Sequence, residues 1–255
     1  MGINPYAPPA DDHREPTPQL APEHGPPQGW EVGEVLGFAF AAVRANWAVV
    51  VPAFFIYMAL EVGPGALLRT MAAQFGHGRG VAELAVVARH AVVVLSTGLI
   101  LPGFVRILLA AARREETHLV TLFGGADRFV PMAALAFCET APGLLMELAH
   151  NQRVSLVVVA IVSAILYSGL NFAKYYVVDQ NFGALDAFRA AWALTRGQHL
   201  KVLGFAFVAS FVCVIGIVAC GVGVLVTAST AMMGFAVIYL RLSGRGGAAM
   251  GRPIG

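Results

Sequence analysis

Long apolar runs separated by short polar stretches recur along most of the chain. Give or take several residues, they cover 46–68, 90–112, 129–149, 154–178, 199–221 and 223–242. Each run comes close to the roughly 20 residues that a helix needs to cross a hydrocarbon core of about 30 Å. The runs are continuous rather than alternating, which favours helices over the strands of a barrel. The pattern therefore predicts an all-α fold, a polytopic helical membrane protein with about six transmembrane helices.

Three amphipathic segments precede the first, third and fifth apolar runs. They end at Arg44, Arg128 and Arg196, and the third also carries Trp192. Each fits a short helix in the cytoplasmic interface, with its apolar side among acyl chains and its arginine at the headgroups. The alternative is that these segments are cytoplasmic extensions of the spans or ordinary loops. The interfacial interpretation gives three units, each an interfacial helix followed by a membrane hairpin.

Composition supports a membrane protein and separates the two ends of the chain from its middle. The sequence is 58% hydrophobic and 13% charged, whereas soluble domains carry about 25% charged residues. Residues 1–29 are rich in proline and acidic residues, which is typical of a disordered cytoplasmic tail and not of a signal peptide. We therefore expect a membrane domain over 30–242 and a flexible basic tail over 243–255.

The distribution of basic residues predicts the orientation of the chain. With six spans and the N-terminus inside, twelve Lys and Arg residues fall on or near the cytoplasmic side. The other side then keeps only Arg69, Arg79, Arg89 and Arg153. This asymmetry favours both termini in the cytoplasm, because positive residues concentrate in cytoplasmic loops. An odd number of spans would break the argument.

Ionisable groups inside predicted spans are costly and are therefore functional candidates. Glu139 lies near the middle of the third run, where Pro142 could open the helix to water, and Arg106 is the natural partner to test. One interpretation makes the two a buried pair or an ion relay. The other, which we favour, has Arg106 snorkelling to the headgroups and Glu139 protonated or beside a packing defect. Glu61 and Glu147 lie nearer the opposite end of their runs, in reach of water.

The fourth run has a polar side. Tyr167, Asn171 and Lys174 follow one another at i, i+4 and i+7, which places them on one helix face. Such a face can line a cavity or hydrogen-bond to neighbouring helices, and helix contact is the interpretation that we favour. Asn171 and Lys174 complete the candidate intramembrane polar site with Glu139 and Arg106.

Signals for catalysis, metals and nucleic acid are missing from the sequence. The seven histidines form no H-x-x-x-H pattern, and the three cysteines lie in apolar segments without metal-ligand spacing. We find no G-x-S-x-G or Walker A motif. Basic residues are spread over loops instead of forming one patch. The sequence thus predicts a protein that is not an enzyme, without metal, cofactor or nucleic-acid partner.

Several stretches carry a resemblance to known proteins. VVDQNFGALDAFRAAWALTRGQHLKVLGF, from Val177 to Phe205, and the chain onward to Leu242 resemble the C-terminal half of uncharacterised bacterial integral membrane proteins. These are similar in turn to the membrane domain of some glycerophosphodiester phosphodiesterases. LFGGADRFVPM resembles the middle of the same group, and NPYAPP resembles the start of many small bacterial membrane proteins. The resemblance implies a six-helix domain of a bacterial inner membrane, without phosphodiesterase activity, which belongs to a separate soluble domain.

Two classes of function compete on this evidence. The leading hypothesis is a scaffold, assembly or envelope-homeostasis factor that touches membrane lipids and binds a membrane-protein partner or a second copy of itself. The alternative is a small transporter or channel that uses the polar intramembrane residues. A membrane-embedded lipid enzyme has the least support, because no paired carboxylates or His/Asp constellation gathers at one depth. A close-packed interior would count against transport.

Overall fold

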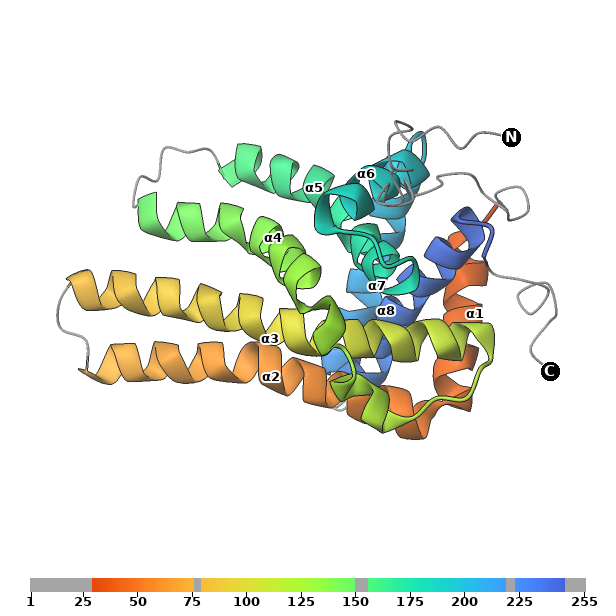
Figure 1. Cartoon of the computed structure of the whole chain (residues 1–255), viewed down its shortest axis with the longest axis horizontal. Helices are drawn as coiled ribbons and strands as arrows, with labels where there is room; N and C mark the ends of the chain where they lie inside the picture. The colour runs from red at the N-terminus through yellow and green to blue at the C-terminus, as the bar shows by residue number, and fades with distance from the viewer. Residues whose placement is uncertain (1–28, 76–78, 150–155, 219–222, 246–255) are drawn as a thin grey trace, which may run out of the picture.

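The computed structural model describes residues 29–75, 79–149, 156–218 and 223–245. Within these ranges the chain is helical, without a strand (Figure 1). The α-helices are α1 (Val32–Ala45), α2 (Trp47–Phe75), α3 (Arg79–Arg113), α4 (Phe129–Ala149), α5 (Leu156–Asp179), α6 (Ala184–Thr195), α7 (His199–Val218) and α8 (Gly223–Leu242), and two 3₁₀ turns, η1 (Leu119–Phe123) and η2 (Ala126–Arg128), precede α4. Most of the two predicted tails, 1–28 and 246–255, lies outside the described residues.

Five segments are long and apolar enough to cross a membrane. They are Trp47–Leu68, Glu83–Arg113, Leu119–Glu147, His199–Ile217 and Gly223–Leu242. Together they support the predicted helical, multi-pass membrane protein. The fourth predicted run, 154–178, coincides with α5, which has 24 residues but is not one of the five. The count of six spans therefore stays a prediction.

The long helices form three consecutive hairpins, as the sequence units predict. α2 runs beside α3, α4 beside α5, and α7 beside α8 (Figure 1). A short element precedes each hairpin: α1, the η1–η2 segment and α6. The middle one is not a regular helix, because Gly124 and Gly125 separate its two 3₁₀ turns. A methyl group on Gly103 of α3 would lie 2.0 Å from the Leu122 carbonyl oxygen, so the segment rests directly on the α3 backbone.

α1 is packed on protein along much of its apolar face. Val35 and Ala39 are fully buried, and α1 contacts α8. The Arg241 guanidinium of α8 donates to the Glu34 carboxylate of α1 over 2.7 Å. Phe40 remains 52% exposed on the other side. The predicted interfacial helix therefore leaves only part of its surface uncovered by protein.

An ion cluster joins the ends of α3, α5 and α8 next to α1. Arg113 and Arg245 contact the Asp179 carboxylate over 2.5 and 3.1 Å, and the Tyr239 hydroxyl donates to it over 2.8 Å. The Asp179 side chain is only 6% exposed, so these three partners compensate its loss of hydration. We call this end of the molecule the α1 end.

A candidate ligand cavity between the long helices

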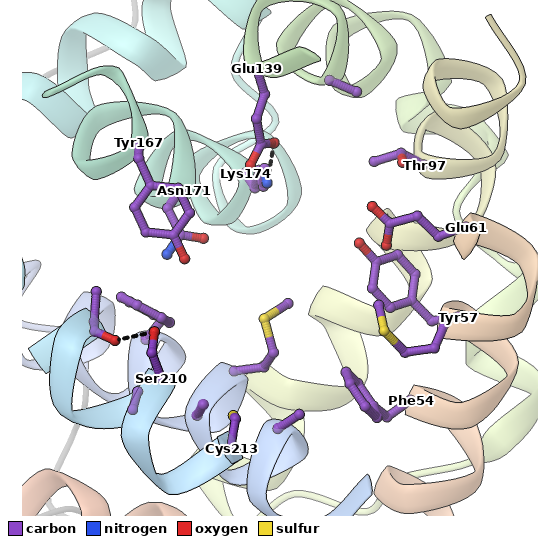
Figure 2. Close-up of a pocket in the computed structure, with 18 of the residues that line it drawn as sticks. Phe54, Tyr57, Glu61, Thr97, Glu139, Tyr167, Asn171, Lys174, Ser210 and Cys213 are labelled. Carbon is purple, nitrogen blue, oxygen red and sulfur yellow. Dashed lines mark hydrogen bonds and ion pairs between the residues drawn. The ribbon is translucent and has the colours of Figure 1, made fainter. Parts of the chain in front are cut away.

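The six long helices line a cavity of about 550 Å³ that is partly open to the surface of the bundle. Side chains of α2, α3, α4, α5, α7 and α8 all reach it (Figure 2). Much of its wall is apolar, with Phe54, Phe235 and several alanines. Its polar lining includes Tyr57, Glu61, Thr97, Glu139, Tyr167, Asn171, Lys174 and Ser210. The interior of this bundle is therefore hollow and polar in part.

An ion pair between α4 and α5 forms one wall of the cavity. Lys174 Nζ lies 2.6 Å from a Glu139 carboxylate oxygen, with the two side chains 12% and 32% exposed. The Thr140 hydroxyl, next to Glu139, donates to the Ala136 carbonyl of the preceding turn and so offers that carboxylate no hydrogen bond. Lys174 is thus the partner that holds Glu139 in place.

The polar side of α5 faces this space. Tyr167, Asn171 and Lys174 all line the cavity, and Asn171 Nδ2 is buried without a hydrogen-bond partner. We expected this face to contact a neighbouring helix, and it does so in part: Lys174 pairs with Glu139 of α4, and the Tyr167 ring lies edge-on to Phe235 of α8. The same face also lines the cavity. The i, i+4, i+7 spacing aligned the three side chains correctly, but it carried no information on how far the facing helices stand from α5.

Glu61 is the cavity residue that sequence reasoning undervalued. We placed it near the end of its run, in reach of water, but α2 continues to Phe75 and puts Glu61 near the helix middle. It lies on the same wall as Tyr57, across the cavity from Tyr167 and Asn171 (Figure 2). Its Oε2 atom is buried without a partner.

Arg106 does not meet Glu139. Its guanidinium donates to both carboxylate oxygens of Asp127, over 2.9 and 2.7 Å, and to the Gly124 carbonyl. It lines a separate surface pocket near the α1 end.

Helix register explains why Arg106, the partner to be tested, does not reach Glu139. Phe129 and Ala133 of α4 pack against Gly98 of α3. Arg106 lies eight residues beyond Gly98, toward the α1 end. Glu139 lies six residues beyond Ala133, in the opposite direction. At 1.5 Å per residue the two Cα atoms are about 20 Å apart along the bundle axis.

The predicted anchors occupy the three short elements. Arg44 and Arg196 are exposed, and the Trp192 side chain of α6 is 39% exposed. Arg128 differs, because its Nε lies 3.2 Å from the Asp127 carboxylate. Two of the three arginines therefore remain accessible to headgroups.

Comparisons with known proteins add no relative. No protein-family model, no curated protein and no solved structure matches this chain. The resemblance to bacterial six-helix membrane proteins therefore stays a prediction. Among the residues that the structure describes, no three His, Cys, Asp or Glu side chains gather where they could hold a metal ion.

Proposed function

We propose that the protein is a membrane transporter that binds a small solute in the central cavity and carries it across the bilayer. The observation that carries this proposal is a space of about 550 Å³ lined by an ion pair and further polar groups inside a bundle of apolar helices. Pockets of this size are typical of small-molecule sites. As in the sequence analysis, the proposed location is a bacterial inner membrane, with both termini in the cytoplasm.

Unpartnered polar atoms support a ligand in this space. Glu61 Oε2, Thr97 Oγ1 and Asn171 Nδ2 are buried without hydrogen-bond partners, and all three side chains line the cavity. A buried polar group without a partner costs about 1–3 kcal/mol. Because the three come from α2, α3 and α5, one ligand or a few waters in the cavity would satisfy groups that no single helix contact could reach.

Transport accounts for these features better than scaffolding does. A scaffold or assembly factor needs a well-packed interior and an outer binding surface, and charged groups around an internal space would only destabilise it. The scaffold hypothesis would regain its place if the cavity proved to bind nothing. No catalytic role is proposed for any residue.

Flux into proteoliposomes tests the proposal. The purified protein is reconstituted and offered radiolabelled alanine, lysine, glutamate, acetate, tetramethylammonium and hexyltrimethylammonium. We expect protein-dependent, saturable uptake of at least one compound, and we expect Glu139→Gln to reduce it about tenfold or more, as loss of a charge-assisted contact would.

Glu147→Gln is the matched control. Like Glu139, Glu147 belongs to an ion pair, in this case with Arg89, but it does not line the cavity. Uptake by this variant should equal that of the natural protein. Absence of uptake for all six compounds, or equal rates for the two glutamine variants, would overturn the proposed function.

A further inference from the structure

We propose that the ligand is an amphipathic organic cation and that it reaches the cavity from the lipid phase, through a gap between α4 and α5. This inference rests on the proposed transport function and specifies its substrate class. The charge balance of the cavity, its apolar walls and a second, smaller cavity support it together.

With Glu61, Glu139 and Lys174 all ionised, the charges around the cavity do not balance. Glu61, Glu139 and Lys174 are the Asp, Glu, Lys and Arg side chains among the described residues that line it. Lys174 contacts Glu139, which leaves Glu61 as a carboxyl group without a cationic contact across the cavity (Figure 2). One unit of positive charge on a ligand would neutralise the site, whereas an anion would add to the excess.

The walls around Glu61 suit an organic cation better than a hydrated inorganic one. Phe54, Tyr57 and Met58 line this side. Phe104 stacks on one face of the Tyr57 ring, with a centroid separation of 5.4 Å, and fixes its orientation. Aromatic faces attract organic ammonium groups. The apolar remainder of the wall provides contacts for the hydrocarbon part of a ligand, which a purely hydrophilic ion would leave unused.

A smaller cavity of about 130 Å³ lies between α4 and α5, beside the central one. Glu139 and Tyr167 line both spaces, so these two side chains stand between them, and a rotation of either would join the two. Cys138, Pro142 and Leu166 also line the smaller one. Without an N–H group, Pro142 removes one helical hydrogen bond from α4, which eases local bending at the gap.

The outer end of this gap opens on a surface that faces hydrocarbon. Cys138 is exposed, and its neighbour Phe137 is 56% exposed. Both lie in a segment apolar enough to cross a membrane. A ligand whose hydrocarbon part dissolves in the bilayer can therefore enter between α4 and α5 and bring its charged group to Glu139 and then to Glu61.

The substrate class is tested with three probes in proteoliposomes. Hexyltrimethylammonium is an amphipathic cation, tetramethylammonium a hydrophilic cation and hexanesulfonate an amphipathic anion. We expect saturable uptake of the first, at least about tenfold slower uptake of the second and none of the third, and we expect Glu61→Gln to slow the first about tenfold. Equal or faster uptake of tetramethylammonium or hexanesulfonate would overturn the substrate class and leave transport intact.

The path is tested by labelling a native cysteine after folding. In a Cys213→Ala/Cys220→Ala protein, Cys138 is modified with N-pyrenylmaleimide or with methyl methanethiosulfonate. The bulky adduct should slow hexyltrimethylammonium uptake about tenfold, as a blocked passage would, while the small methyl disulfide adduct should have little effect. The control carries Phe137→Cys with Cys138→Ala in the same background, which moves the adduct to a neighbouring exposed position that does not line the gap.

The outcomes separate this inference from the function beneath it. Full uptake with pyrene on Cys138, or equal slowing by pyrene at position 137, would refute access through the gap. If none of these probes and none of the six compounds above is taken up, the transport function itself fails.

Discussion

Removing the cation of the Glu139–Lys174 pair is the most direct test of how the cavity is stabilised. Lys174→Met keeps the length of the side chain and deletes the only Lys or Arg among the described residues that line the cavity. Glu139 then joins Glu61 as a carboxyl group without a cationic contact. We therefore expect this variant to lose more stability than Glu139→Gln, which leaves one positive and one negative side chain, Lys174 and Glu61, around the cavity.

The magnitude follows from how far the pair is buried. Exposed ion pairs contribute about 0–1 kcal/mol, and removing one partner of a fully buried pair costs about 3–5 kcal/mol. The Lys174 and Glu139 side chains are 12% and 32% exposed, so the pair lies between these limits. We expect Lys174→Met to lower the free energy of unfolding by about 2–3 kcal/mol and Glu139→Gln by about 1 kcal/mol.

A double-mutant cycle separates the pair from the rest of the cavity. Because Lys174→Met/Glu139→Gln removes both charges, it should recover most of the loss caused by Lys174→Met alone. Unfolding free energies are measured in mixed micelles by circular dichroism. Arg189→Met, which breaks the pair with Asp186 whose side chains are 69% and 54% exposed, serves as the exposed reference. If Lys174→Met costs no more than Arg189→Met, or if the double variant stays as unstable as Lys174→Met, the buried-pair account is wrong.

Three further experiments test the fold and the topology. Gly103→Ala should lower stability by about 1–3 kcal/mol in a thermal unfolding assay, because the new methyl group overlaps the η1 backbone, whereas Gly37→Ala, which meets nothing within 4 Å, should be neutral or stabilising. A hydrogen bond from an α8 arginine lowers the pKa of Glu34, so its contribution to stability is present at neutral pH and is lost as pH falls through the folded-state pKa; Glu34→Gln should flatten the acid limb of the stability curve. For topology, single cysteines are introduced as Arg79→Cys and Glu116→Cys and exposed to a membrane-impermeant maleimide. Position 79 should be labelled from outside and position 116 from inside. Labelling of both positions from the same side, or of each from the opposite side, would refute the proposed orientation.

Local patterns predicted the helices well. The continuous apolar runs located all six long helices, and the segments ending at Arg44 and Arg196 became α1 and α6. The i, i+4, i+7 spacing from Tyr167 to Lys174 correctly placed these side chains on one face. These features depend on residues close together in the chain, so hydropathy and helical periodicity suffice to find them.

Which residues line the cavity depends on the axial register between neighbouring helices. The periodicity of a single helix carries no information on that register. Two cationic side chains, Arg106 and Lys174, lie inside apolar runs, and only Arg106 was considered as a partner of Glu139. The choice between them was made by contacts such as that of Gly98 with α4, where the added Cβ of any other residue would lie 3.0 Å from Ala133. That contact fixes the depth of α4 against α3 and carries Glu139 away from Arg106 and toward α5. A larger residue at position 98 would force α3 and α4 apart, and with them the wall that holds the ion pair in the cavity.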